Sequence, residues 1–338
     1  MPAVAQTFPL YYLNRGRQRQ GIINGSFDIW QRGTRFTLGP GVTYTADRFY
    51  YDNGGGTGTK QIELAFVNPD EPPAEENIPN ALLIVRAGIS GESTNDIFGQ
   101  KVPGVDYGAG KAVSVGMWLW TTGAEVIEDI IIEQNFGTGG SPSGSTFTVI
   151  ATNVVLSGTP QWFEFTTILP SILGKTLGTN NDDHINLFFR FGQNVDKLLY
   201  TTGWQLNVGT ATLTFQRKNR GEEFADCLLF FERQNIAGNF LPSPAMAWDS
   251  SHVWANLTFT PKWRPPNKVA LSIVPRFGYW KDGYRRSFSA EWWAYADATE
   301  TTIQGQFTVN YDPGPRGSVY AWEASAGSPI WIDISSEL

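Results

Sequence analysis

Cysteine and histidine are scarce in this 338-residue chain, which has one cysteine and two histidines. A single cysteine, Cys227, excludes an intramolecular disulfide and a thiolate metal cage. His184 and His252 leave little material for zinc sites, Ser-His-Asp triads or histidine acid–base chemistry. An enzyme built on this chain would therefore have to use carboxylates.

Charged residues are also few, at 17% of the chain against about 25% in ordinary soluble proteins. The net charge is −7 and the isoelectric point is near 5.0, which argues against a nucleic-acid binder of the basic-patch kind. No apolar run reaches the roughly 18 residues of a membrane span, so we expect no membrane insertion. The first twenty residues lack the ordered regions of a signal peptide.

Glycine, proline and aromatic residues are abundant: 36 Gly, 20 Pro, 13 Trp, 12 Tyr and 22 Phe. Short apolar runs separated by Gly, Pro and Asn follow one another without intervening helical patterns, which is typical of antiparallel sandwiches. We predict an all-β protein with a jelly-roll-like antiparallel β-sandwich. The expected domains are an N-terminal arm (1–20), the sandwich (21–216), a bridging helix (217–235) and a smaller second β-domain (236–338).

Period-2 alternation predicts the two faces of a strand. In KAVSVGMWLW, the even positions from Ala112 to Trp120 lie on one face, and the odd positions from Val113 to Leu119 lie on the other. We also expect a strand at IINGSFDIW, with Phe27, Ile29 and Trp30 in the core because large aromatics dominate sandwich cores.

One segment, GEEFADCLLFFERQ, has helical periodicity. Phe224, Cys227, Leu228 and Phe231 recur at helical spacing, and Asn219 can cap the N-terminus. This segment predicts the bridge between the two β-domains. The arm before the sandwich has no periodicity; its Arg15, Arg17 and Arg19 are candidates for anchoring to a larger assembly.

Four stretches of the sandwich segment follow one another in the order NGSFDIWQRGT, TYTADRFYYD, GKTLGTNNDD and GWQLNVGTATLTFQRKNRGEEFADCLLFFER. With them, this segment resembles a family of bacteriophage tail-fibre or minor tail proteins. The closing helix departs from the family pattern at FADCLLFFER. The resemblance implies a carbohydrate-binding-module-like jelly roll, a place in the virion among other virion proteins, and a homo-oligomer, with a trimer favoured.

No cofactor is expected. Asp47 and Arg48 are interpreted as a structural ion pair or backbone clamp, and the oxygen-rich NNDD segment at 180–183 as a turn. The alternative for both is a structural calcium, since Ca²⁺ takes oxygen ligands and carbohydrate-binding jelly rolls often hold one. GGGTG at 54–58 is interpreted as a flexible loop rather than a phosphate cradle.

Catalysis is not expected. Glycoside hydrolysis needs two carboxylates about 5–10 Å apart, one of them with a raised pKa. The candidate carboxylates are the acidic run Glu125, Glu128, Asp129 and Glu133, and Glu291 beside two tryptophans. The run is interpreted as a solvated strand face, with a catalytic role as the weaker alternative. The two histidines have no partner that the sequence reveals.

Aromatic clusters in the C-terminal domain are the candidate binding residues: Tyr279, Trp280, Tyr284, Trp292 and Trp293. Adjacent tryptophans on a strand point to opposite faces, so Trp292 or Trp293 leaves the core. The exposed ring contacts a neighbouring subunit or stacks on a glycan, or packs within the domain.

We therefore expect a non-enzymatic virion protein, a tail-fibre or tail-tip component that attaches to host-surface glycan through many weak contacts. The alternative is a head fibre or capsid decoration protein with a purely structural role. A carbohydrate-active enzyme and a stand-alone carbohydrate-binding module are further alternatives.

Overall fold

The computed structural model describes residues 20–122, 125–215, 217–236, 245–247, 252–260, 262, 268–271, 276–281, 284–294, 302–309, 319–323 and 330–337. From residue 235 onward, side chains are described only at 259, 260, 262 and 333–337. The chain divides into two compact units, one up to Glu223 and one from Phe224 to Glu337. No helix among the described residues is long and apolar enough to cross a membrane.

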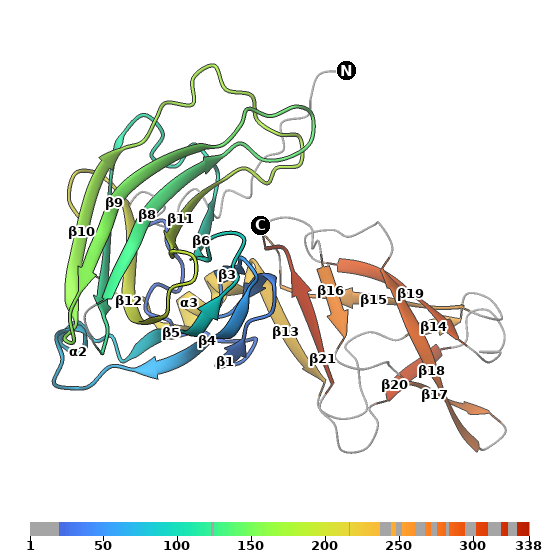
Figure 1. Cartoon of the computed structure of the whole chain (residues 1–338). Helices are drawn as coiled ribbons and strands as arrows, with labels where there is room; N and C mark the ends of the chain where they lie inside the picture. Colours follow the sequence, from blue (N-terminus) through green and yellow to red (C-terminus); the bar gives the residue numbers. More distant parts are fainter. Residues whose placement is uncertain are drawn as a thin grey trace. The chain divides into compact units, whose positions relative to one another are not determined.

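The first unit is a sandwich of two antiparallel sheets, as predicted (Figure 1). In spatial order, sheet A contains β1 (Arg35–Thr37), β4 (Thr57–Phe66), β5 (Asn80–Ser90), β12 (Lys197–Val208), β7 (Ala112–Trp120) and β10 (Gln161–Ile168). Sheet B contains β2 (Gly41–Tyr44), β3 (Phe49–Asn53), β6 (Ile97–Pro103), β11 (His184–Arg190), β8 (Glu125–Asn135) and β9 (Thr146–Leu156). Strands distant in sequence are neighbours: β11 lies between β6 and β8, and β12 between β5 and β7.

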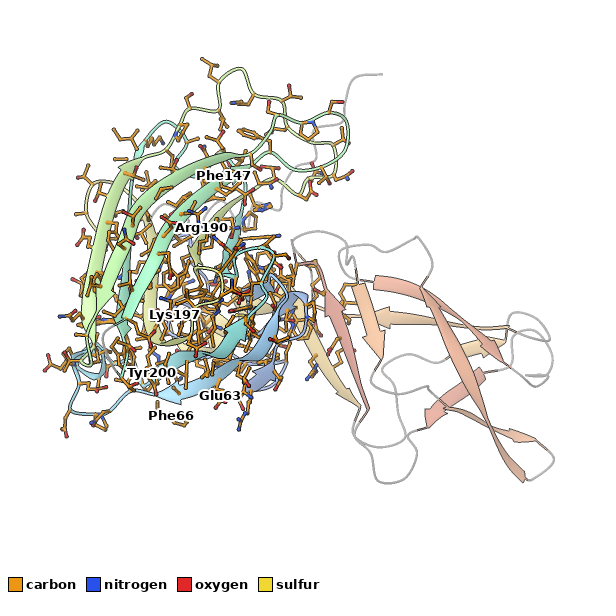
Figure 2. The ribbon with its side chains drawn as sticks, viewed as in Figure 1. Glu63, Phe66, Phe147, Arg190, Lys197 and Tyr200 are labelled. Carbon is orange, nitrogen blue, oxygen red and sulfur yellow. The ribbon has the colours of Figure 1, made fainter. Side chains whose placement is uncertain are left out.

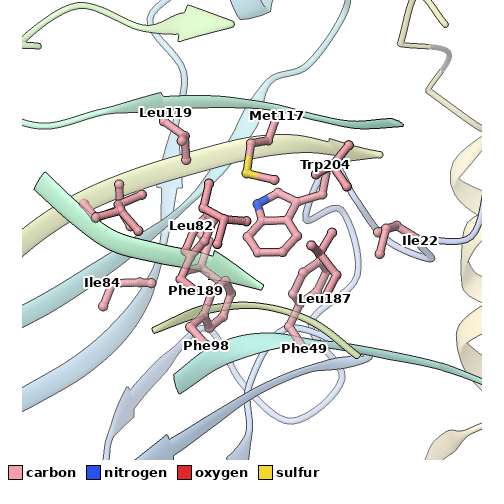
Figure 3. Close-up of a cluster of buried hydrophobic side chains, with 14 of the residues drawn as sticks. Ile22, Phe49, Leu82, Ile84, Phe98, Met117, Leu119, Leu187, Phe189 and Trp204 are labelled. Atoms are coloured by element: carbon pink, nitrogen blue, oxygen red, sulfur yellow. The ribbon is translucent and has the colours of Figure 1, made fainter. Parts of the chain in front are cut away.

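The core between the sheets is aromatic and aliphatic, and Trp204 is the largest side chain that is fully buried in it. Its ring contacts Phe49, Phe98 and Phe189 of sheet B, with ring centroids 5.3, 5.6 and 4.6 Å away (Figure 3). A β-bulge between Thr202 and Gln205 re-aims the strand and turns Trp204 inward. The two faces predicted for β7 are confirmed, and the structure shows that the face with Val113, Val115, Met117 and Leu119 points into this core.

The strand predicted at IINGSFDIW is wrong. This segment is a series of turns, with positive φ at Asn24 and Phe27. The Asn24 amide donates to the carbonyls of Ile29 and Asp47, and its oxygen accepts from Ile29 N. These local bonds replace a strand ladder. The burial prediction is confirmed for Phe27 and Ile29, while Trp30 is half-buried against the core.

The two helices in the described ranges are short. The first, α2 (Pro72–Glu75), is one turn between β4 and β5. The second, α3 (Arg220–Leu228), begins as predicted, with the Asn219 side chain accepting a 2.8 Å bond from Gly221 N. The helix predicted to run through residue 235 is too long, because β13 (Phe231–Ile236) pairs with β21 (Ile330–Ser335) instead. In residues 231–236, pairing with a distant strand therefore decides the structure, although the local sequence has helical periodicity.

The described part of the second unit consists of strands after the end of α3. In its described part, β16 (Lys268–Leu271), β21 and β13 form a three-stranded sheet. The other described strands close into a barrel in the order β14 (Ala245–Ala247), β15 (His252–Thr258), β19 (Thr302–Val309), β18 (Tyr284–Ala294), β17 (Arg276–Lys281) and β20 (Val319–Glu323). The Arg233 guanidinium donates to both oxygens of Asp333, at 2.7 and 2.6 Å, and so joins β13 to β21.

Candidate functional site

The candidate site is the face of sheet B that points away from the core. Because Tyr51, Phe98, Leu187 and Ile132 point into the core, the residues between them on β3, β6, β11 and β8 point outward. We call this surface the outer face of sheet B. Its residues are Tyr44, Tyr50, Gly99, Lys101, Asp129, Ile131, Glu133, Asn186, Phe188, Arg190, Phe147 and Val149.

Strand register arranges these side chains in rows across the sheet. One row runs from Lys101 through Asn186 and Glu133 to Phe147, each paired with the next on the neighbouring strand. The adjacent row runs from Gly99 through Phe188 and Ile131 to Val149. Directly paired residues have Cβ atoms about 4.5–5.5 Å apart, so the first row sets polar side chains and Phe147 side by side, and the second row is apolar.

A hydrogen-bonded chain holds the polar row in place. The Tyr50 hydroxyl donates to Asn186 Oδ1 at 3.1 Å, and Asn186 Nδ2 donates to the hydroxyl at 2.8 Å and to Glu133 Oε2 at 3.3 Å. Asn135 Nδ2 donates to the other Glu133 oxygen at 3.0 Å. Burial raises the pKa of Tyr50, so its phenol stays protonated and neutral.

Two cations border this chain. Arg190 Nε donates to Asp129 Oδ2 at 2.9 Å, and a second guanidinium nitrogen contacts the same oxygen. The Lys101 ammonium lies 5.5 Å from the centroid of the Tyr50 ring, within cation–π range. The outer face thus carries both hydrogen-bond donors and acceptors, with Arg190 paired to Asp129.

Exposure rises toward the edge strand β9. Phe188 and Ile131 in the middle of the sheet are each 3% exposed, whereas Phe147 and Val149 on β9 are 60% and 50% exposed. Figure 2 shows Phe147 and Arg190 on this sheet, with Glu63, Phe66 and Tyr200 on the other. An accessible aromatic ring beside fixed polar groups is the combination that an amphipathic ligand needs, because its apolar face can stack while its hydroxyls form hydrogen bonds.

Sheet A carries aromatics of a different kind on its outward face. Trp118 and Trp162 pack at 5.7 Å, and Trp120 and Tyr200 stack at 5.3 Å. Both pairs belong to a small apolar cluster with residues near α2 and with Phe215, so neighbouring segments cover them. This cluster is therefore a second packing core and less suited to binding.

The four carboxylates of the predicted acidic run lie in two different environments. Asp129 and Glu133 lie on the outer face, while Glu125 accepts two bonds from Leu198 N and Glu128 pairs with Lys197 at 2.9 Å. His184 is buried in β11, its Nδ1 2.8 Å from the Asp182 carbonyl, and burial lowers its pKa. These five residues therefore do not form the pair of proton donor and proton acceptor that acid–base catalysis needs.

The segments considered for calcium serve as structural clamps. Asp47 accepts from Gln31 N at 2.9 Å and lies 3.8 Å from Arg32, and Arg48 donates to the Lys101 carbonyl at 2.5 Å. In NNDD, the Asp182 and Asp183 carboxylates accept from Thr138 N and Val105 N. Among the described residues, no group of His, Cys, Asp and Glu is arranged to hold a metal ion.

The predicted binding and anchoring residues stay predictions. Arg15, Arg17 and Arg19 lie outside the described residues. Tyr279 and Trp280 lie on β17, and Tyr284, Trp292 and Trp293 on β18, but their side chains are outside the described set. The backbone pairs Tyr279 with Arg286 and Trp280 with Arg285. Sequence reasoning missed the outer face of sheet B, since only strand pairing assembles it.

Several solved structures are similar to this chain, but no known family matches it. No family model and no curated protein matches the chain. Among solved structures, it is similar to the enzymatically active domain of tailspike protein 4 of bacteriophage CBA120, with 10% identity over 56% of this chain, 21% of that chain and a TM-score of 0.33. This chain therefore spans about a fifth of that chain's length.

Carbohydrate-binding modules are also among the similar structures. The family 11 module of Clostridium thermocellum is 12% identical over 52% of this chain and 97% of its own, with a TM-score of 0.30. The tandem CBM22-1–CBM22-2 domain of Paenibacillus barcinonensis Xyn10C is 6% identical over 94% and 98%, with a TM-score of 0.32. We take the function from the outer face of sheet B rather than from these likenesses.

Proposed function

We propose that this protein binds glycans through the outer face of sheet B. The observation that carries the proposal is the row Lys101, Asn186, Glu133 and Phe147, which places two charged groups, one amide and one exposed ring side by side. A sugar ring presents apolar C–H faces and many hydroxyls, and both kinds of group find partners in this row.

The proposal is for binding without catalysis. Asp129 and Glu133 are both engaged, by Arg190 and by the two amides of Asn135 and Asn186. Glycoside hydrolysis needs two carboxylates that face the substrate, whereas the oxygens of these two carboxylates are directed at protein groups.

We further propose that binding attaches a virion to its host, as part of a tail fibre or tail tip. The resemblance of NGSFDIWQRGT and the later stretches to phage tail proteins supports this placement. Repetition of a weak site over a homo-oligomer would give avidity by effective concentration.

The test is glycan-array and host-cell binding of the full chain, comparing wild type with Phe147→Ala. Loss of the ring should weaken binding at least tenfold, which corresponds to about 1.4 kcal/mol. Phe66→Ala is the matched control, since Phe66 is 76% exposed on the other sheet. Equal binding by wild type and Phe147→Ala would refute the outer face as the site.

One observation favours the second candidate, a structural protein of the head or tail. Val155, like Phe147 and Val149, is exposed on the edge strand β9, and apolar edge strands suit protein interfaces. In that case Phe147→Ala would reduce incorporation into particles, and no glycan would bind the wild type.

A further inference from the structure

The end of the sandwich contains a buried ammonium surrounded by oxygen. Lys60 on β4 points inward, and its side chain is 3% exposed. Its Nζ donates to Asn53 Oδ1 at 2.7 Å, to the Gly55 carbonyl at 2.8 Å, to Glu92 Oε1 at 2.5 Å and to Asp96 Oδ1 at 2.9 Å. We call these four residues the Lys60 cage.

The three side chains of the cage, Asn53, Glu92 and Asp96, are held in place by groups other than Lys60. Asn53 Nδ2 donates to the carbonyls of Leu38 and Gly39. Arg86 donates to Asp96 Oδ2 at 3.0 Å and to both oxygens of Glu92 at 2.8 and 2.9 Å. The cage is therefore preformed. The segment 54–58, expected to be a flexible loop, is bonded to the sandwich through the Gly55 carbonyl, which accepts from Lys60, and through Gly54 N, which donates to Asp96.

Charge balance requires a cation at this position. Glu92 and Asp96 bring two negative charges, and Arg86 brings one positive charge. Without the Lys60 ammonium, one buried negative charge would stay uncompensated, which is strongly destabilising. A single monovalent cation restores neutrality.

Distances and ligand number select the kind of cation. Calcium takes six to eight oxygens at about 2.3–2.6 Å, and magnesium takes six at about 2.0–2.1 Å. The cage offers oxygens from only four residues, and three of the four distances, 2.7, 2.8 and 2.9 Å, are ordinary N–H···O hydrogen-bond lengths. An ion that donates hydrogen bonds fits this geometry better than a divalent metal.

We propose that the Lys60 cage is a binding site for a monovalent ammonium ion whose resident ligand is the tethered Lys60 side chain. A free primary ammonium takes the same place when the side chain is shortened. The cage thereby fastens β3, β4 and the β5–β6 connection without a metal ion.

The experiment is thermal unfolding of full-length Lys60→Ala with added propylammonium, which replaces the atoms that the substitution removes. The substitution should lower the Tm by about 10 °C. Propylammonium should restore several degrees of this loss in a saturable manner. Tetramethylammonium, which has no N–H donor, should restore nothing.

Two controls keep the proposal falsifiable. Lys60→Met keeps the stem and lacks the charge, so propylammonium cannot enter and should not rescue it. Wild type and Lys111→Ala, at an exposed lysine, should not respond to propylammonium or to chelator. A wild-type Tm that falls on chelation overturns the proposal, as does equal rescue by tetramethylammonium or a Lys60→Ala protein as stable as wild type.

If Lys60→Ala does not accumulate in folded form, expression with propylammonium in the medium decides the question. Recovery of folded protein only with propylammonium supports the proposal. Recovery with calcium instead overturns it, because the cage would then prefer a divalent metal ion.

Discussion

The Tyr50 hydroxyl and the Asn186 side-chain amide exchange two hydrogen bonds, of 3.1 and 2.8 Å, although 136 residues separate them in the chain. The bonds join β3 to β11 across β6, on which Gly99 pairs with Tyr50 and Lys101 pairs with Asn186. This pair fixes the polar side of the outer face, so its energetic coupling can be measured directly.

Replacing the pair should reveal that coupling. Tyr50→Phe should cost about 1 kcal/mol of unfolding free energy, and Asn186→Ala about 1–3 kcal/mol because it leaves the Tyr50 hydroxyl and Glu133 without this partner. In urea unfolding, the double variant should lose about 1 kcal/mol less than the sum. Strictly additive losses would contradict the coupling, and Thr152→Ala, exposed on β9, should change nothing.

Trp204→Ala should remove the central contact between the sheets. The ring is fully buried among Phe49, Phe98 and Phe189, so truncation leaves a cavity and should cost about 3–5 kcal/mol. Chemical denaturation measures the loss. Phe66→Ala, at an exposed ring, should stay within about 0.5 kcal/mol of wild type.

Gly99→Ala should separate β6 from β11. A Cβ at Gly99 would lie 2.3 Å from the Leu187 carbonyl oxygen and 2.5 Å from Phe188 Cβ, so the backbone would have to move. The cost should be about 1–3 kcal/mol, and glycan binding should weaken because the rows shift. Gly39→Ala, with open space around the added atom, is the control. Unchanged stability in Gly99→Ala would show that the strands tolerate a wider separation.

Acid should weaken the Lys60 cage. Burial acts to raise the pKa of Glu92, but hydrogen bonds from Lys60 and Arg86 outweigh it, so this pKa lies below the usual value of 4.5 for a glutamate. A lowered folded-state pKa contributes stability that is present above about pH 4.5 and is lost as the pH falls through the folded value.

The unfolding free energy should therefore be nearly constant from pH 7 to about pH 5 and fall below it. The fall should be shallower in Glu92→Gln, which has no carboxylate to protonate, than in the control Glu75→Gln at an exposed glutamate. Urea midpoints across this range provide the measurement. Parallel curves for all three proteins would exclude Glu92 as a source of the acid sensitivity.

Local patterns in the sequence predicted much of the sandwich. Alternation in β7 placed Val115 and Leu119 on the same face, which is the core face, and Asn219 was correctly expected to cap α3. The opening segment failed, because Asn24 bonds to the backbone nearby and holds turns where alternation suggested a strand. The helix was extended too far, because Phe231 has a strand partner a hundred residues later.

The outer face of sheet B could not be predicted in the same way. The sequence alone determined the fold class, the inward face of individual strands and the scarcity of histidine and cysteine, since these follow from composition and from alternation within a few residues. Only the tertiary structure decided that β11 lies between β6 and β8, and thus that Lys101, Asn186, Glu133 and Phe147 form one row. Strand order and register depend on burial and pairing summed over the whole chain, so no local segment encodes them.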